Sequence, residues 1–140
     1  MYKIVLDTNV LVSGSLIPKG KSAFILDSWR NGYIQIVTSL EILEEFEHVM
    51  KNKFNAPSDE IETVKAFLIW KGIIVEPKQK IDMIKEDPDD NKVLEVAIEG
   101  NVDYIVSGDK DLTRIGVFQG IRIVTPDEMG EIIRFNISHR

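Results

Sequence analysis

The 140-residue chain has no cysteine, only two histidines and no long apolar segment. The absence of cysteine excludes disulfides, thiolate zinc sites and a cysteine nucleophile. No apolar run approaches the roughly 20 residues of a membrane-spanning helix, and the N-terminal stretch reaches Asp7 before any secretory core can form. We therefore expect a cytoplasmic protein that does not interact with membranes.

Basic residues are also in the minority, with 17 Lys and Arg against 23 Asp and Glu and a formal charge of -6. The chain therefore lacks the global positive field of a simple nucleic-acid-binding protein. An enzyme that gathers acids around divalent cations can still act on phosphodiesters, because bound metals invert the local charge. With 44% hydrophobic residues, the chain is expected to form a single domain over residues 1–140.

Short apolar runs rich in β-branched residues alternate with helical patterns along the whole chain. This alternation predicts an α/β fold, and continuous apolar runs are typical of strands that are buried on both faces. We therefore expect a three-layer α/β/α arrangement around a central parallel sheet of about five strands. The strands are expected at 3–6, 34–37, 73–75, 104–106 and 121–124, and the helices at 23–30, 40–51, 58–71, 88–99 and 126–135.

Two acids directly follow predicted strands. Asp7 ends the run Val5-Leu6-Asp7, and Asp109 comes three residues after Val106. In open α/β sheets, ligands bind outside the carboxyl ends of the strands. Each acid alone is also a plausible turn residue. Together, they are expected to lie at the same edge of the sheet.

The helix expected at 40–51 supplies a third candidate, Glu45. At 100° per residue, Glu45 lies near the edge of the apolar arc, one turn from the helix start, whereas Glu44 and His48 face solvent. The stretch Thr38-Ser39-Leu40-Glu41 has the form of a capping box, which gives Glu41 a structural role. The arc itself consists of Ile42, Leu43, Phe46, Val49 and Met50.

A fourth candidate lies in the acidic stretch 87–91. Asp87 suits an N-cap and Pro88 the first position of a helix, so a simple helix start is one interpretation. Asp90, however, projects onto the inward face of this helix, whereas an acid that only compensates the helix dipole could point outward. An inward acid needs a partner. The residues that define this face are Val93, Leu94 and Ala97.

The four acids together indicate a metal site more strongly than any of them alone. Carboxylates held close together repel and raise one another's pKa, and a bound divalent cation removes this conflict. Oxygen ligands without His or Cys fit Mg²⁺ or Mn²⁺ better than zinc. His48 and His139 are expected at the surface, and Trp29 and Trp70 are expected to pack within helices and not to stack on bases.

Four segments in this order resemble PIN-domain nucleases: IVLDTNVLVS (4–13), SLEILEEF (39–46), DPDDN (87–91) and VSGDKDL (106–112). The resemblance extends over nearly the whole chain. It is greatest to the prokaryotic, VapC-like branch described as toxins of toxin-antitoxin pairs, which the closing IVTP (123–126) also fits.

The resemblance implies a metal-dependent endoribonuclease that uses Mg²⁺, or Mn²⁺, to hydrolyse RNA. It also implies a cognate antitoxin that places an Arg or Lys among the acids, and a homodimer. Asp111 would be a fifth acid, and Ser107 stands where the family often has Thr. The implied catalytic and metal-binding residues are Asp7, Glu45, Asp90 and Asp109, and the implied auxiliary residues are Thr8, Asn9, Ser107 and Asp111.

Three other functions remain open from the residues. A phosphotransfer domain would need a Lys at a late strand end, where this chain has Val124-Thr125-Pro126. A phosphatase with an aspartyl nucleophile would need a second Asp at position 9, which is Asn9. A non-catalytic RNA or protein interaction module is the third. If RNA is bound, the phosphate contacts expected near the site are Lys19, Lys21, Lys110 and Arg114.

Overall fold

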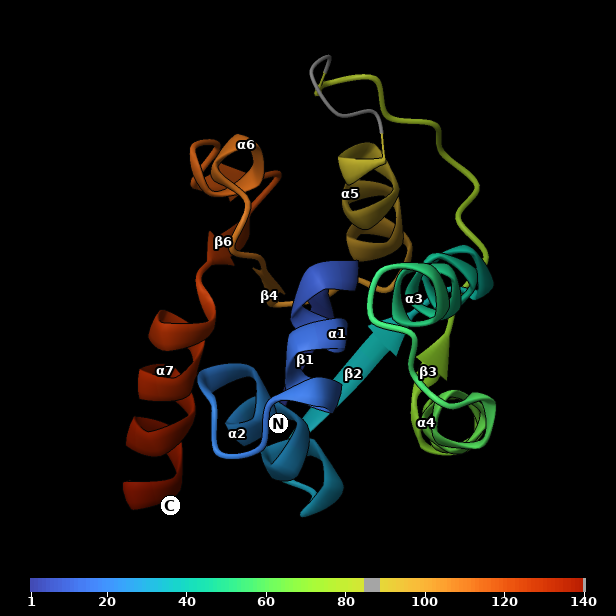
Figure 1. Cartoon of the computed structure of the whole chain (residues 1–140). Helices are drawn as coiled ribbons and strands as arrows, with labels where there is room; N and C mark the ends of the chain where they lie inside the picture. Colours follow the sequence, from blue (N-terminus) through green and yellow to red (C-terminus); the bar gives the residue numbers. More distant parts are fainter. Residues whose placement is uncertain (85–88, 140) are drawn as a thin grey trace.

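The computed structural model describes residues 1–84 and 89–139, so the helix start expected at Asp87 and Pro88 lies outside the described residues. Within them, six strands form one sheet in the order β3-β2-β1-β4-β6-β5 (Figure 1). Neighbours pair in parallel except β5 and β6, which are antiparallel. The strands are β1 (Tyr2–Leu6), β2 (Ile34–Thr38), β3 (Ile73–Ile74), β4 (Tyr104–Val106), β5 (Val117–Phe118) and β6 (Ile121–Val124).

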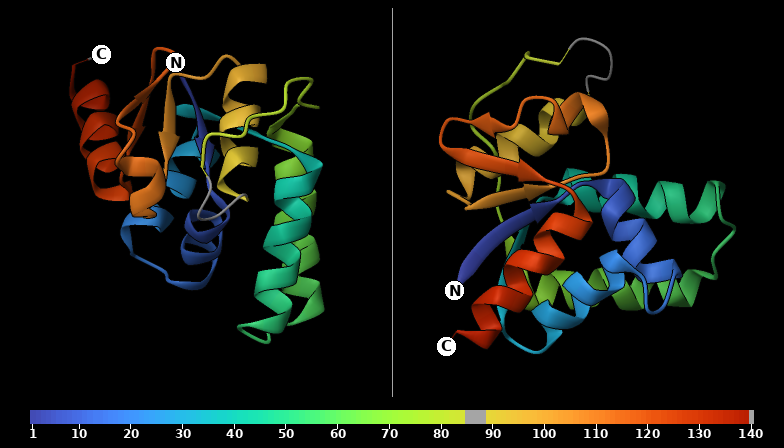
Figure 2. Two further views of the ribbon diagram at one scale, coloured as in Figure 1. Left: turned by 90° about the horizontal axis from the view of Figure 1, so that it is seen from above. Right: turned by 90° about the vertical axis from the view of Figure 1, so that its left-hand side faces the viewer.

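Helices cover both faces of this sheet. Figure 2 shows α1, α2 and α7 on one face, whereas α5 packs against β1, β2 and β4 from the other. The predicted three-layer α/β/α fold is therefore confirmed. The helices are α1 (Thr8–Leu16), α2 (Lys21–Arg30), α3 (Leu40–Asn52), α4 (Ser58–Lys71), α5 (Asp90–Glu99), α6 (Lys110–Thr113) and α7 (Pro126–Ser138).

The core is continuous across the central strands. Ile4, Val5 and Ile105 are fully buried, as expected for strands covered on both faces. The apolar arc predicted for α3 is also confirmed, because its five residues are the buried residues of that helix. No helix in the described part of the chain is long and apolar enough to span a membrane.

The capping box predicted at 38–41 is wrong. Thr38 is the last residue of β2, and Ser39 caps α3 with its hydroxyl, which accepts a hydrogen bond from the Ile42 N–H at 3.2 Å. Because the strand runs one residue further than expected, Glu41 is at the second helical position and cannot complete the box. Its carboxylate instead lies 3.6 Å from the Lys92 ammonium on α5.

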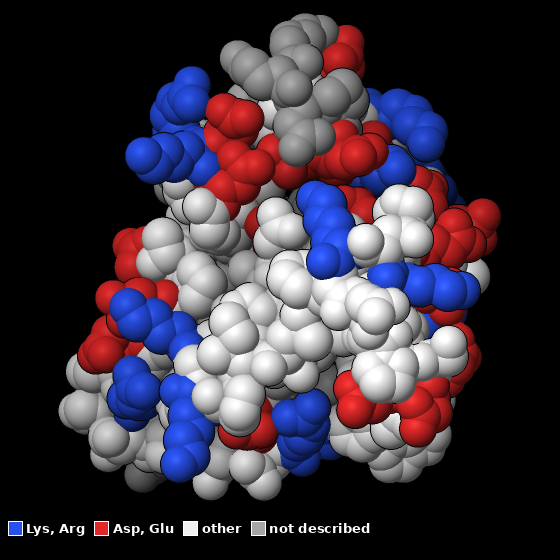
Figure 3. Space-filling view, in the orientation of Figure 1, with Lys and Arg blue, Asp and Glu red and all other residues white. Residues whose placement is uncertain are grey.

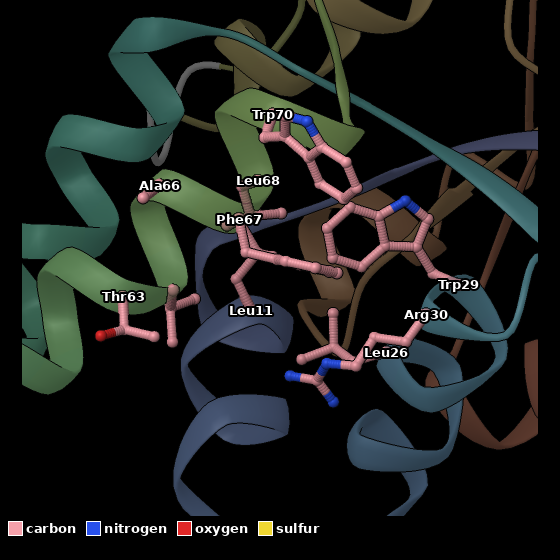
Figure 4. A pocket seen from close by; sticks show the side chains of 10 residues that line it. Leu11, Leu26, Trp29, Arg30, Thr63, Ala66, Phe67, Leu68 and Trp70 are labelled. Atoms are coloured by element: carbon pink, nitrogen blue, oxygen red, sulfur yellow. The ribbon is translucent and has the colours of Figure 1, made fainter.

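The two tryptophans differ in their surroundings. Trp29 is 2% exposed, as expected for a packing residue, but Trp70 is 78% exposed, so the prediction that it too is a packing residue is wrong. The reason is that α4 buries only Ile61 and Leu68. Trp70 lies at an open apolar cavity of about 570 Å³ between α1, α2 and α4 (Figure 4), where the Phe67 ring contacts both indoles.

Candidate metal centre

Asp7 is held at the junction of β1 and α1. It follows the strand directly and caps the helix, because its Oδ1 accepts a hydrogen bond from the Val10 N–H at 2.8 Å. Its Oδ2 accepts a hydrogen bond from the Ser107 hydroxyl. With 5% of its surface exposed, the carboxylate has a fixed orientation at the carboxyl end of the central strand.

Ser107 and Asp109 come from the end of β4, which is next to β1 in the sheet. Ser107 is fully buried, and its hydroxyl also accepts a hydrogen bond from the Asp109 N–H at 2.9 Å. Asp109 in turn caps α6 through the Asp111 N–H at 2.8 Å. One serine therefore connects the two strand-end acids.

Asp90 and Asp89 are at the start of α5, on the other face of the sheet. Asp90 is 9% exposed, which agrees with its predicted inward direction. Asp89 is at the rim and pairs with Lys92 at 3.4 Å. Burial disfavours the charge of Lys92, but Asp89, Glu41 and Glu45 outweigh it and raise the lysine pKa. Acids thus surround this end of α5.

The four predicted acids converge on one small cavity of about 50 Å³, close to the volume of one or two water molecules. Asp111 does not line it, but ligand oxygens of Asp90, Asp109 and Asp111 all lie within 4.8 Å of one another. Figure 3 shows acidic side chains gathered around α5 and α6. The cavity is lined by Asp7, Thr8, Asn9, Glu45, Asp89, Asp90, Val93 and Asp109.

The electrostatics of this pocket favour a bound cation. Burial raises the pKa of Asp7 above its ordinary value of 3.8; hydrogen bonds from Ser107 and Val10 oppose this shift, and the nearby Asp109 charge adds to it. A divalent cation would relieve both the burial cost and the repulsion. Since the donors are carboxylate oxygens, the residues fit a hard ion such as Mg²⁺ or Mn²⁺.

The sequence did not lead us to expect that Asp89 lines the pocket. It also did not lead us to expect that Lys92 pairs with Asp89 and Glu41. The acidic stretch 87–91 was a signal for Asp89, but its position at the rim depends on how α5 meets α3. Among the expected phosphate contacts, Lys21 pairs with Asp127 at 3.4 Å and Arg114 pairs with Asp111 at 3.0 Å. Lys19 and Lys110 are exposed.

The family model of the PIN domain matches residues 3–111, a range that includes all the acids of this pocket. The chain therefore belongs to the PIN domain family. It is also similar to an uncharacterized protein, MJ1680, of Methanocaldococcus jannaschii, with 32% identity over 114 residues that cover 79% of this chain and 72% of that protein.

Solved structures share the fold at low sequence identity. VapC20 of Mycobacterium tuberculosis, described as a sarcin-ricin loop cleaving toxin, matches with a TM-score of 0.61 and 13% identity, covering 85% of this chain and 98% of that one. VapBC2 of Rickettsia felis, bound to a DNA fragment from its promoter, matches with a TM-score of 0.58 and 15% identity, and the match covers 88% of this chain and 98% of that one. PAE2754 of Pyrobaculum aerophilum matches with a TM-score of 0.59 and 12% identity, and the match covers 95% of this chain and 90% of that one.

Proposed function

We propose that this PIN domain protein is a metal-dependent endoribonuclease that hydrolyses RNA phosphodiester bonds and acts as the toxin of a toxin-antitoxin pair. The observation that supports this most is the convergence of Asp7, Glu45, Asp90 and Asp109, from four separate segments, on one pocket at the carboxyl edge of the sheet. The structural likeness to a toxin described as cleaving the sarcin-ricin loop supports the choice of substrate.

In this proposal Mg²⁺, which Mn²⁺ can replace, is held by Asp7, Asp90 and Asp109 with Glu45, and Asp111 is a fifth acid nearby. Bound there, the metal would make water a stronger nucleophile at neutral pH and would offset charge on the phosphate. The fully buried Ser107 keeps Asp7 in place through its hydroxyl.

The other auxiliary residues lie on the first turn of α1. Thr8 is buried and Asn9 is exposed, and both line the pocket. The start of a helix carries partial positive charge, which favours negatively charged phosphate oxygens. We assign Thr8 and Asn9 to orienting the scissile phosphate, while Glu45 lines the same pocket from α3.

The partners follow from the same proposal. A small antitoxin would inhibit the nuclease by placing an Arg or Lys among the acids, and the likeness to VapBC2 supports such a pair. We further propose that residues 1–140 act as one nuclease domain and that two copies form a homodimer. Light scattering of the purified protein tests the dimer, and a monomer at micromolar concentration would contradict it.

Neighbouring acids on α3 provide a matched pair of variants for the cleavage assay. Glu45 lines the pocket, whereas Glu44 is exposed outside it. With single-stranded RNA of mixed sequence and Mg²⁺ or Mn²⁺, Glu45→Gln should lower the cleavage rate by at least about 10²-fold, as removal of one charge-stabilising group from an active site does. Glu44→Gln should cleave like the unmodified protein, and EDTA should stop both.

Equal cleavage by the two variants would remove Glu45 from the site. No cleavage by folded unmodified protein with either metal would favour the non-catalytic interaction module instead.

The candidate phosphate-binding residues Lys110 and Arg114 lead to a second prediction for the same cleavage assay. Lys110 and Arg114 lie on or beside α6, next to Asp109. If they bind RNA phosphates, cleavage should weaken as salt increases, and the double variant Lys110→Ala/Arg114→Ala should show a smaller salt dependence because two counterions fewer are released. The slope of log(kcat/KM) against log[salt] measures this effect. An identical slope in both proteins would exclude these side chains from RNA binding.

A further inference from the structure

The helix α5 carries a row of three polar side chains, Asn91, Glu95 and Glu99. They are spaced four residues apart, which places them on one stripe of the helix. Asn91 is 4% exposed and Glu95 is 8% exposed, although the packed face of a helix is normally apolar. Buried polar groups cost free energy unless they are hydrogen-bonded, so their partners indicate their role.

All three side chains bind the backbone of the preceding segment, residues 76–84, which belongs to no helix or strand. Glu99 Oε1 accepts a hydrogen bond from the Lys78 N–H at 3.1 Å. Glu95 Oε2 accepts one from the Ile81 N–H at 2.9 Å. After β3, the chain therefore runs beside α5 as far as residue 84 (Figure 1).

Asn91 makes three hydrogen bonds to the backbone of this segment. Its Oδ1 accepts hydrogen bonds from the Met83 N–H at 3.1 Å and the Ile84 N–H at 2.9 Å, and its Nδ2 donates to the Ile84 carbonyl at 2.8 Å. The amide thus satisfies both backbone polar groups of Ile84, whose side chain is also buried. We call this set of three hydrogen bonds the Asn91 clamp.

The Asn91 clamp lies next to the acids of α5. Asp90 and Asp89 immediately precede Asn91 and line the proposed metal site. The first turn of a helix lacks hydrogen bonds to a preceding turn, so side-chain contacts often stabilise it. Asn91 lies in the first turn of α5, and its clamp attaches this turn to the backbone of residues 83–84.

We infer that Asn91 is a positioning residue for the acidic pocket: its clamp on Met83 and Ile84 holds the first turn of α5 so that Asp90 faces Asp109. This inference rests on the proposed function, because it connects Asn91 to the proposed metal site. Residues that orient metal ligands contribute about 10- to 100-fold to metal affinity. A residue that only stabilises the fold would leave metal affinity unchanged.

The test is direct Mn²⁺ binding, measured by electron paramagnetic resonance without RNA. Asn91→Ala removes the whole clamp and should weaken Mn²⁺ binding by about tenfold or more. Glu99→Ala removes one hydrogen bond at the far end of the same row, and it should bind Mn²⁺ like the unmodified protein. In cleavage assays, excess Mn²⁺ should restore most of the maximal rate of Asn91→Ala. Unchanged Mn²⁺ affinity together with a lower melting temperature would overturn the inference.

Asp90→Asn separates failure of the clamp from failure of the proposed site. If Asp90→Asn loses Mn²⁺ binding and Asn91→Ala keeps it, only the clamp is wrong. If both bind Mn²⁺ like the unmodified protein, the pocket is not the metal site and the proposed function fails with it.

Hydrogen exchange of the unmodified protein covers the case in which Asn91→Ala does not fold. The Met83 and Ile84 amides should exchange slowly and become slower with Mg²⁺. Fast exchange of both amides, with and without Mg²⁺, would contradict the clamp.

Discussion

Asp7→Asn should cleave RNA at least about 10²-fold more slowly than the unmodified protein, and yet it should unfold at a higher temperature in the absence of metal. Both effects have one cause, the loss of the negative charge of Asp7. Asp7 is a buried carboxylate whose charge is unfavourable without a cation. Asn has nearly the same shape: its oxygen can accept the Val10 N–H hydrogen bond of the α1 cap, and its NH2 group, in place of Oδ2, can donate to the Ser107 hydroxyl oxygen.

The pH dependence follows from the raised pKa of Asp7. Between its ordinary value of 3.8 and its higher value in the folded, metal-free protein, the folded state binds more protons than the unfolded state. The free energy of unfolding therefore receives a contribution from Asp7 that is lost as pH rises through this window. The stability advantage of Asp7→Asn should thus be largest near neutral pH and should narrow as the solution is acidified.

Thermal melts with EDTA and with Mg²⁺ measure both effects. Mg²⁺ should raise the melting temperature of the unmodified protein, because it binds the folded state, and should do little for Asp7→Asn. Asp103→Asn is a suitable control, since Asp103 is an exposed acid whose carboxylate accepts a hydrogen bond from the Lys3 N–H outside the pocket. A lower metal-free melting temperature for Asp7→Asn would contradict the cost that we assign to its burial.

Phe46→Ala should lower the stability of the protein more than any substitution in the pocket. Phe46 is fully buried on α3, and removal of such a ring costs about 3–5 kcal/mol through lost burial and a new cavity. Since small domains have about 5–15 kcal/mol in total, this is a large fraction. Urea unfolding measures the effect.

Phe135→Ala on α7 is the matched control for Phe46→Ala. Phe135 is 66% exposed, so its loss should change the free energy of unfolding by no more than about 0.5 kcal/mol. Equal effects of the two substitutions would show that α3 is not anchored through Phe46.

Much of the fold could be predicted because its strands are buried on both faces and therefore form continuous apolar runs. The helix α1 could not, since its sequence, TNVLVSGSL, is rich in β-branched residues and contains Gly14, which disfavour helix formation. It forms because Asp7 caps it and because Val10, Leu11 and Val12 are buried. Tertiary packing here overrides local propensity.

The strand β5 escaped prediction for a different reason. It has only two residues, and it pairs with β6 across a two-residue turn in which Gln119 and Gly120 both have positive φ, 50° and 83°. Such a turn matches the twist of a hairpin, but Gln-Gly is a weaker signal for it than Asn-Gly. An antiparallel edge strand therefore had no clear signal in the residues.

The candidate site, like the fold, could be predicted from the sequence only in part. The placement of Asp7 and Asp109 follows from a general rule about strand ends, and that of Glu45 and Asp90 from helical periodicity. The contacts that join separate elements could not be predicted. These include the bridge of Lys92 between Asp89 and Glu41, and the Asn91 clamp on residues 83–84.

The acids of the pocket are proposed to hold a divalent cation, and anomalous diffraction from crystals grown with Mn²⁺ tests this most directly. We expect one or two strong anomalous peaks within coordination distance of Asp7, Asp90 and Asp109, at about 2.0–2.6 Å from their oxygens. Crystals that show no peak in this pocket, or a peak only elsewhere on the molecule, would contradict the proposed metal site.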